Sequence, residues 1–381
     1  MQVGKVPPAL PILRADLDLS LVTGGWVASI LNLVSATLGI ACGLLADRVG
    51  ARKIVAGGVL MLAIGAFVGG FAGNGFTLLV ARAIAGVGLV SVAVAGPRII
   101  VAASRPRDFG LTLGIWSIYM PTGMALAMFS APYLMTWLGW RGLWFFNAAA
   151  LTLFLGWFVN VTSRKRWEGV PRPKHQRTWR EVLEVFRLPG PWLLGVIFGC
   201  YALQWFAMMT WLPTFLIETQ GHTAASAAWI AALVVTANIG GCLGGAWLLH
   251  HHAPRWLLQV IALSVMGLCA IGVFGNGLPP GLKPALAFVF SAAGGLLPAA
   301  TLAASTVHAP THDQVSTVSG FIVQGSNTGG LAGPPVMAAI VAHFGGWAGS
   351  EWLLVGSAVL GVVLAIGVRH IEIHRAQPPP P

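Results

Sequence analysis

Apolar runs of about twenty residues follow one another along almost the whole chain, and short polar loops separate them. A helix needs roughly 20 apolar residues to cross the hydrocarbon core of a bilayer. The chain is 56% hydrophobic, above the roughly 45–50% of soluble domains. We therefore predict an all-α membrane protein. Its predicted spans cover about 20–46, 54–73, 76–103, 109–135, 142–161, 190–216, 224–249, 255–274, 282–308, 314–341 and 351–368.

The first apolar run, Met1 to Leu13, is too short to cross a bilayer. A helix of that length extends about 20 Å, against a hydrocarbon core of about 30 Å. No small-residue cleavage site follows the run, so a secretory signal peptide is not indicated. We expect this segment to be the second half of a truncated first span, with the native product starting upstream or the gene shortened. The chain would then hold about 11.5 spans.

The basic residues are distributed unevenly over the two sides of the predicted membrane. Most of the 22 Lys and Arg residues fall in loops on the side that also holds both termini. Because cytoplasmic loops carry an excess of Lys and Arg, that side is the cytoplasm. We expect a multi-pass protein of the bacterial cytoplasmic (inner) membrane. The net charge of +11 lies in loops between spans, which argues against nucleic-acid binding.

The loops also suggest a division of the chain into two bundles of six helices. The predicted parts are an N-terminal bundle at 1–161, a basic cytoplasmic linker at 162–189, a C-terminal bundle at 190–368 and a disordered cytoplasmic tail at 369–381. A short internal repeat supports the duplication, because Gly123 precedes Gly139-Trp140 at the same spacing as Gly330 precedes Gly346-Trp347.

A charged loop interrupts the apolar pattern between the second and third predicted spans. It reads Gly43-Leu44-Leu45-Ala46-Asp47-Arg48-Val49-Gly50-Ala51-Arg52-Lys53. The pattern G-x-x-x-D-R-x-G-x-R-K resembles the signature loop between helices 2 and 3 of the major facilitator superfamily. The resemblance implies a cytoplasmic gate built from Gly43, Asp47, Arg48, Gly50, Arg52 and Lys53. We expect Asp47 to cap a neighbouring helix and the basic residues to pair with acids such as Asp108.

Other motifs extend this resemblance. The run Arg82-Ala-Ile-Ala-Gly86-Val-Gly88 is similar to the superfamily pattern R-x-x-x-G-x-G. The resemblance implies the major facilitator fold, two pseudo-symmetric halves with a solute site between them lined by helices 1, 4, 7 and 10. A weaker resemblance to the cyanate and nitroimidazole permease-like branch implies a small anionic or weakly polar solute. It rests on Gly139-Trp140-Arg141, Gln324-Gly-Ser-Asn327 and Gly333-Pro334-Pro335.

The charged residues that lie deepest in the predicted spans are the basic residues Lys5 and Arg82. An arginine stays charged and is costly at mid-membrane, so Arg82 should face the protein interior and meet carbonyls or an anionic ligand. For Arg82, the alternative is a purely structural role. For Lys5, the alternative is a side chain that extends toward the outer surface. All carboxylates fall in loops or at helix ends, which argues against a proton-driven exporter of cationic drugs.

Uncharged polar residues inside the spans complete the predicted solute site, because such groups are costly when they face lipid. Tyr201 and Gln204 share one helix face, as do Gln324 and Asn327. Hydrogen bonding between helices is the alternative role. The predicted substrate-binding residues are Lys5, Arg82, Tyr119, Tyr201, Gln204, Trp205, Gln324 and Asn327.

The sequence contains no nucleotide-binding loop, metal-ligand cluster or nucleophile–base arrangement, so we expect no enzymatic activity, cofactor or metal. We predict a monomeric secondary transporter that moves its solute by alternating access, with a proton as a candidate coupling ion. One alternative is an exporter of drugs or amphiphiles. Another is a non-transporting membrane sensor, a scaffold or a decayed transporter.

Overall fold

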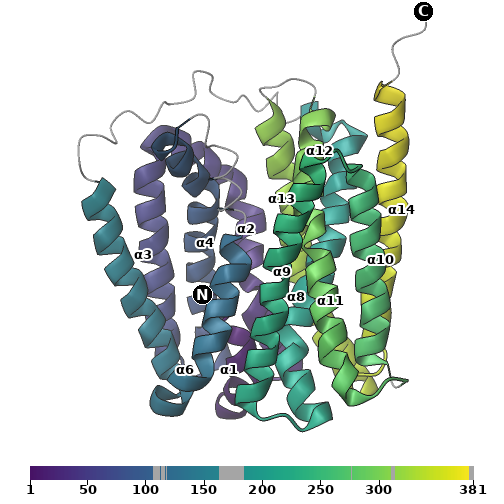
Figure 1. Cartoon of the computed structure of the whole chain (residues 1–381). Helices are drawn as coiled ribbons and strands as arrows, with labels where there is room; N and C mark the ends of the chain where they lie inside the picture. The colour runs from purple at the N-terminus through teal and green to yellow at the C-terminus, as the bar shows by residue number, and fades with distance from the viewer. Residues whose placement is uncertain are drawn as a thin grey trace, which may run out of the picture. The chain divides into compact units, whose positions relative to one another are not determined.

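The computed structural model describes residues 1–105, 112, 116, 118–162, 184–275, 277–309 and 314–376. The regular structure of these residues is helical (Figure 1). The long helices are α1 (Val6–Asp16), α2 (Leu21–Val49), α3 (Ala51–Gly70), α4 (Gly75–Ala103), α6 (Tyr119–Thr162), α8 (Pro189–Gln220), α9 (Ala224–His250), α10 (Arg255–Phe274), α11 (Lys283–Gly294), α12 (Leu296–His308), α13 (Val315–Phe344) and α14 (Ser350–Ala376).

Nine helical segments within the described ranges are long and apolar enough to cross a membrane. The helix α13 is not one of them, because polar residues such as Gln324 and Asn327 lower its hydropathy. The predicted spans 109–135 and 142–161 meet in α6, where Gly139 breaks the helix with φ 64° and ψ 179°. This positive φ lies outside the helical region and is readily adopted only by glycine.

One predicted boundary differs from the structure, and one predicted span contains a helix junction. The predicted span 282–308 coincides with the stretch Pro280–His308, which is long and apolar enough to cross a membrane, and α11 and α12 meet within it at Gly295. There α9 approaches so closely that a Cβ on Gly295 would lie 2.7 Å from the amide nitrogen of Cys242. The predicted disordered tail is corrected for residues up to Ala376, because α14 continues to that residue. Glu372 therefore lies inside a helix, and its side chain is only 16% exposed.

The contacts divide the chain into two compact units. Unit 1 comprises Met1–Gln176 and Met209–Ala232, and unit 2 comprises Arg177–Met208 and Leu233–Pro381. The predicted bundle boundaries at 161 and 190 stay a prediction.

Small residues allow helices inside each unit to pack closely, as is usual where lipid removes the hydrophobic driving force. In unit 1, a Cβ on Gly65 of α3 would lie 2.6 Å from the carbonyl oxygen of Ala81 in α4. In unit 2, Gly325 and Gly329 of α13 lie against the backbone of Gly195 and Gly199 in α8. These close seams fix the helices that carry the polar residues described next.

Candidate functional site

Arg82 projects from α4 into the interior of unit 1 and is 1% exposed. Its Nε donates to the carbonyl oxygen of Val27 at 2.9 Å, and its Nη1 donates to that of Gln2 at 2.6 Å. Its Nη2 lies 3.4 Å from the carbonyl oxygen of Ala28. The guanidinium thus joins α4 to α2 and to the turn before α1. These contacts are those of a structural arginine, and a role in solute binding stays a proposal.

Lys5 lies just before α1 and is also 1% exposed within unit 1. Its Nζ lies 4.4 Å from the ring centroid of Trp144 on α6, a cation–π arrangement. The side chain is therefore buried in the helix packing and does not extend toward the surface. The indole Nε1 of Trp144 is buried and has no hydrogen-bond acceptor among the described residues. An N–H donor without an acceptor and a buried ammonium group both favour a negatively charged neighbour.

The two buried cations of unit 1 lie near each other. Gln2, whose carbonyl binds Arg82, is on the same turn as Lys5, since the amide of Lys5 donates to the carbonyl oxygen of Met1. The buried polar and charged side chains of the described ranges include no Asp or Glu. Carbonyls and an aromatic face offset part of the positive charge, but no described carboxylate neutralises it.

Tyr119 lies beside a cavity of about 330 Å³ in unit 1. The ring of Tyr119 stacks on Trp116, with centroids 4.8 Å apart. Apolar side chains dominate the cavity lining, and Gln2 and Asn147 contribute polar groups. Neither was among the predicted site residues. Asn147 is a lone amide in a long apolar run, which was the signal available in the sequence.

Tyr201 and Trp205 of α8 belong to a buried polar network in unit 2. Asn238 on α9 donates from Nδ2 to the Tyr201 hydroxyl at 3.3 Å and to the carbonyl oxygen of Ser291 at 2.9 Å. Trp205 Nε1 donates to the Ser291 hydroxyl at 3.3 Å. The network joins α8, α9 and α11. Ser291 was not predicted as a site residue, because a single serine in an apolar run carries no distinctive sequence signal.

The other polar residues predicted in unit 2 do not join this network through any hydrogen bond between described residues. Gln204 is fully buried and donates to the carbonyl oxygen of Cys200 in its own helix at 3.2 Å. Gln324 and Asn327 are half-buried and contact each other on α13 at 3.4 Å. The structure therefore brings Tyr201 and Trp205 into one network, and no hydrogen bond between described residues links the α13 pair to it.

The charged loop between the second and third predicted spans is a one-residue junction. The helix α2 ends at Val49 and α3 begins at Ala51, with Gly50 at φ 98° between them. Gly43 lies inside α2, and Arg48 and Lys53 are exposed.

Arg52 joins this junction to the end of α6. Its Nε donates to Thr162 Oγ1 at 2.9 Å, and its Nη2 lies 3.4 Å from the carbonyl oxygen of Val159. The described partners of Arg52 are thus groups at a helix C-terminus, where a cation is favourable. The side chain of Asp47 and all of Asp108 lie outside the described residues, so the expected cap and acid pair stay predictions.

Comparisons with known proteins agree on the kind of protein. The family model of the Major Facilitator Superfamily matches residues 1–281 of this chain. The putative niacin/nicotinamide transporter NiaP of Bacillus subtilis (strain 168) is 23% identical over 272 residues, covering 70% of this chain and 67% of that protein. The cyanate transport protein CynX of Escherichia coli (strain K12) is 25% identical over 268 residues, covering 69% of this chain and 67% of that protein. The 2-nitroimidazole transporter of the same organism is 24% identical over 365 residues, covering 94% of this chain and 88% of that protein.

Solved structures give the same fold. A bacterial homolog of the human lysosomal transporter Spinster, in an inward-facing and occupied conformation, superposes with a TM-score of 0.78. The two sequences are 19% identical, and the alignment covers 99% of this chain and 95% of the other. The predicted all-α major facilitator fold is confirmed, as is the resemblance to cyanate and nitroimidazole permeases at low identity. The chain belongs to the Major Facilitator Superfamily.

Proposed function

We propose that this protein is a secondary transporter that moves a small anionic or weakly polar solute by alternating access. The observation that carries the substrate class is the burial of Lys5 and Arg82, each 1% exposed, without a buried carboxylate among the described residues. Two buried cations are costly unless an opposite charge compensates them. A bound anion would supply that charge while the solute is on the protein.

The relatives support the same class of solute. Their names specify cyanate, niacin or nicotinamide, and 2-nitroimidazole. Cyanate and niacin in its carboxylate form are small anions, and the other two are small and weakly polar. We propose further that the protein lies in the cytoplasmic membrane with both termini in the cytoplasm, as the Lys and Arg distribution indicates. A proton is the proposed coupling ion.

Nicotinate and nicotinamide provide a matched test, because they differ by a carboxylate against a neutral carboxamide on the same ring. We would measure the melting temperature (Tm) of detergent-purified protein with each compound, with cyanate and with 2-nitroimidazole. A solute that binds only the folded protein stabilises it by about 2.7 kcal/mol at a hundred times its Kd. We expect nicotinate and cyanate to raise Tm more than nicotinamide does. Uptake of the stabilising solute into proteoliposomes then tests transport.

The variant Lys5→Met tests the site, because methionine keeps most of the length of the side chain and removes its charge. We expect this variant to lose the difference between nicotinate and nicotinamide. The control is Arg187→Met, which removes one positive charge from an exposed position outside the predicted site and gate. Stabilisation by the cationic drug puromycin, with none of the four small solutes effective, would contradict the proposal. It would favour an exporter of amphiphiles.

A further inference from the structure

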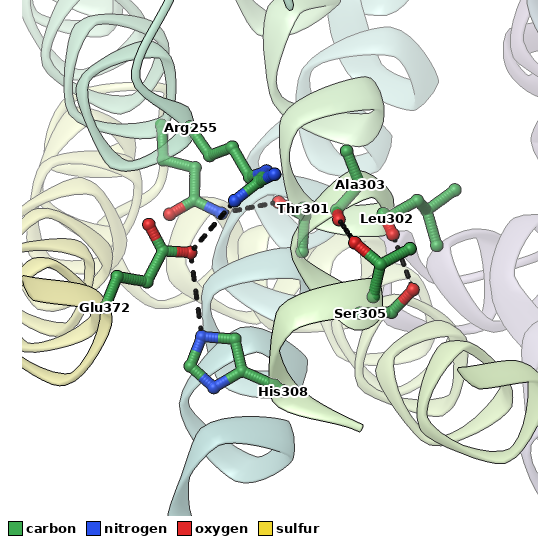
Figure 2. A network of polar contacts seen from close by, with 9 residues as sticks. Arg255, Thr301, Leu302, Ala303, Ser305, His308 and Glu372 are labelled. Atoms are coloured by element: carbon green, nitrogen blue, oxygen red, sulfur yellow. Dashed lines mark hydrogen bonds and ion pairs between the residues drawn. The ribbon is translucent and has the colours of Figure 1, made fainter. Parts of the chain in front are cut away.

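A histidine, a glutamate and an arginine from three helices of unit 2 meet at the end of α12 (Figure 2). His308, the last residue of α12, is fully buried. Its Nε2 lies 3.7 Å from Glu372 Oε1 on α14. Arg255, the first residue of α10, places its Nη1 3.8 Å from the same carboxylate oxygen. One oxygen of Glu372 therefore faces two candidate cations.

None of the three groups completes a hydrogen bond to the others. Both ring nitrogens of His308 and Oε1 of Glu372 are buried and have no hydrogen-bond partner among the described residues. The other side of the imidazole is closed by α8, because a Cβ on Gly190 would overlap Nδ1 of His308. A buried polar group without a partner is costly. The polar groups of the cluster are therefore not satisfied in this arrangement.

The neighbouring polar groups are partly engaged, and the Oε1 atoms of Gln259 and Gln314 are buried without a hydrogen-bond partner among the described residues. On α10, Gln259 donates to Thr301 Oγ1 of α12 at 3.1 Å. On α14, the guanidinium of Arg369 lies 4.8 Å from the ring centroid of Trp256 on α10, and His370 is exposed. From α13, Ser319 contacts Ser305 at 2.9 Å and Gln314 donates to Glu184 at 3.2 Å. Among described charged groups, Glu372 and Arg255 are those within ion-pair distance of the cluster.

We propose that His308 and Glu372 form a proton-binding site. A proton turns the imidazole into a cation, so that the Nε2–H facing Glu372 across 3.7 Å can close to a charge-assisted hydrogen bond, which is stronger than the bond a neutral imidazole donates. That bond would hold the end of α12 to α14. Without the proton, Glu372 keeps Arg255 as its cation, and the link between α12 and α14 is weaker. If the protein is the secondary transporter proposed above, this is the site through which a coupling proton acts on unit 2.

The Tm of detergent-purified protein between about pH 5.5 and pH 7.5 tests the site, since histidine ordinarily changes charge in this interval. The charge-assisted form of the bond exists only at the acidic end, so the wild-type Tm should fall as the pH rises, by about 3 °C. The variant His308→Gln should lose this fall, and so should Glu372→Gln. The control His370→Gln alters an exposed histidine on α14, the helix of Glu372, and should keep the fall of Tm with pH. A wild-type slope retained in His308→Gln would overturn the proposal.

The two single variants make the test robust to a failure of folding. If His308→Gln cannot be purified as folded protein, Glu372→Gln decides alone, because it removes the acceptor and leaves the histidine in place. The Tm slope needs no solute, so it is independent of the proposed transport. A wild-type protein that transports none of the tested solutes would count against the proposed function, whereas a slope shared by all variants would count against the proton site.

Discussion

The carboxylate of Asp16 lies 2.7 Å from the guanidinium of Arg141, and this ion pair joins the end of α1 to the turn in the middle of α6. The same oxygen accepts a hydrogen bond from the indole Nε1 of Trp140 at 2.9 Å. Gly139 makes the geometry possible, since its positive φ turns the chain just before Trp140 and Arg141. Arg141 also donates to the carbonyl oxygen of Ala72, just after α3. Three parts of unit 1 therefore meet at Arg141.

The Asp16 contacts predict a pH-dependent contribution to stability. The Trp140 hydrogen bond, then the Arg141 contact, lowers the pKa of Asp16 below its ordinary value. Because the pKa is lower in the folded state, ionised Asp16 stabilises the folded state at every pH above the unfolded pKa of about 3.9. This stabilisation is lost as the pH falls below that value and through the lower pKa of the folded state. Asp16→Asn should therefore lower Tm at pH 6 by about 1–2 °C. The difference from wild type should shrink below about pH 4.

The control for this prediction is Asp18→Asn. Asp18 has a φ of 49°, and asparagine tolerates that left-handed conformation as well as aspartate does. The substitution removes the same charge two residues away without touching Trp140 or Arg141. Scanning fluorimetry at pH 6 and pH 3.5 measures how much each of the two substitutions lowers Tm. Equal effects of the two substitutions would show that the Asp16 contacts contribute nothing specific.

Arg82 should be far less tolerant of substitution than Lys5. The Arg82 guanidinium bonds carbonyl groups of Gln2, Val27 and Ala28, whereas Lys5 contacts only the face of Trp144 among the described interactions. Removing the guanidinium leaves these buried carbonyl oxygens without its donors, at a cost of about 1–3 kcal/mol for each group left unsatisfied. Arg82→Gln should therefore reduce the yield of folded protein in size-exclusion chromatography, and Arg82→Lys should be intermediate. Normal yield and Tm for Arg82→Gln would refute its structural role.

The charged loop should depend on Gly50 for its shape and much less on Gly43. Gly50 combines φ 98° with ψ 138°, a conformation that side chains adopt only with strain of about 1–3 kcal/mol. A Cβ on Gly43 would meet Val94 at 3.7 Å, an ordinary contact. Gly50→Ala should lower Tm, and Gly43→Ala should leave Tm nearly unchanged. Equal losses of Tm in the two variants would contradict this interpretation of the junction.

Hydropathy and motif spacing predicted most of the helices and the family, because lipid forces backbone groups into helices and makes each span a long apolar run. The close approach of α9 to Gly295, where α11 and α12 meet inside the predicted span 282–308, was not predictable, since it joins residues far apart in sequence. The extension of α14 to Ala376 depends on partners far away in sequence. Glu372 lies near His308 and Arg255, and Arg369 lies over Trp256.

The candidate site was predicted less completely than the fold. The deep positions of Lys5 and Arg82 followed from an apolar run and a motif. The partners that define their environment, Trp144 and the carbonyl oxygen of Gln2, lie on other helices or belong to the backbone. Side-chain type and spacing within one span carry no information on such contacts. The same holds for Ser291, which receives hydrogen bonds from two helices.

The seam between α8 and α13 should be intolerant of any side chain at Gly329. A Cβ there would lie 2.7 Å from the carbonyl carbon of Gly199 and closer still to its oxygen. Relief requires a backbone shift, and overpacking of this kind costs about 1–3 kcal/mol. Gly329→Ala should lower Tm and reduce solute uptake together.

Gly320→Ala is the matched control for the seam, because it lies on the same helix and a Cβ there meets nothing within 4 Å. Alanine loses less conformational freedom than glycine on forming a helix, by roughly 0.5–1 kcal/mol. Gly320→Ala should therefore keep or raise Tm. If both substitutions raise Tm equally, the helices can separate at no cost and the seam does not hold α13. If only Gly329→Ala lowers Tm, contact with the Gly199 backbone limits how closely α13 can pack on α8.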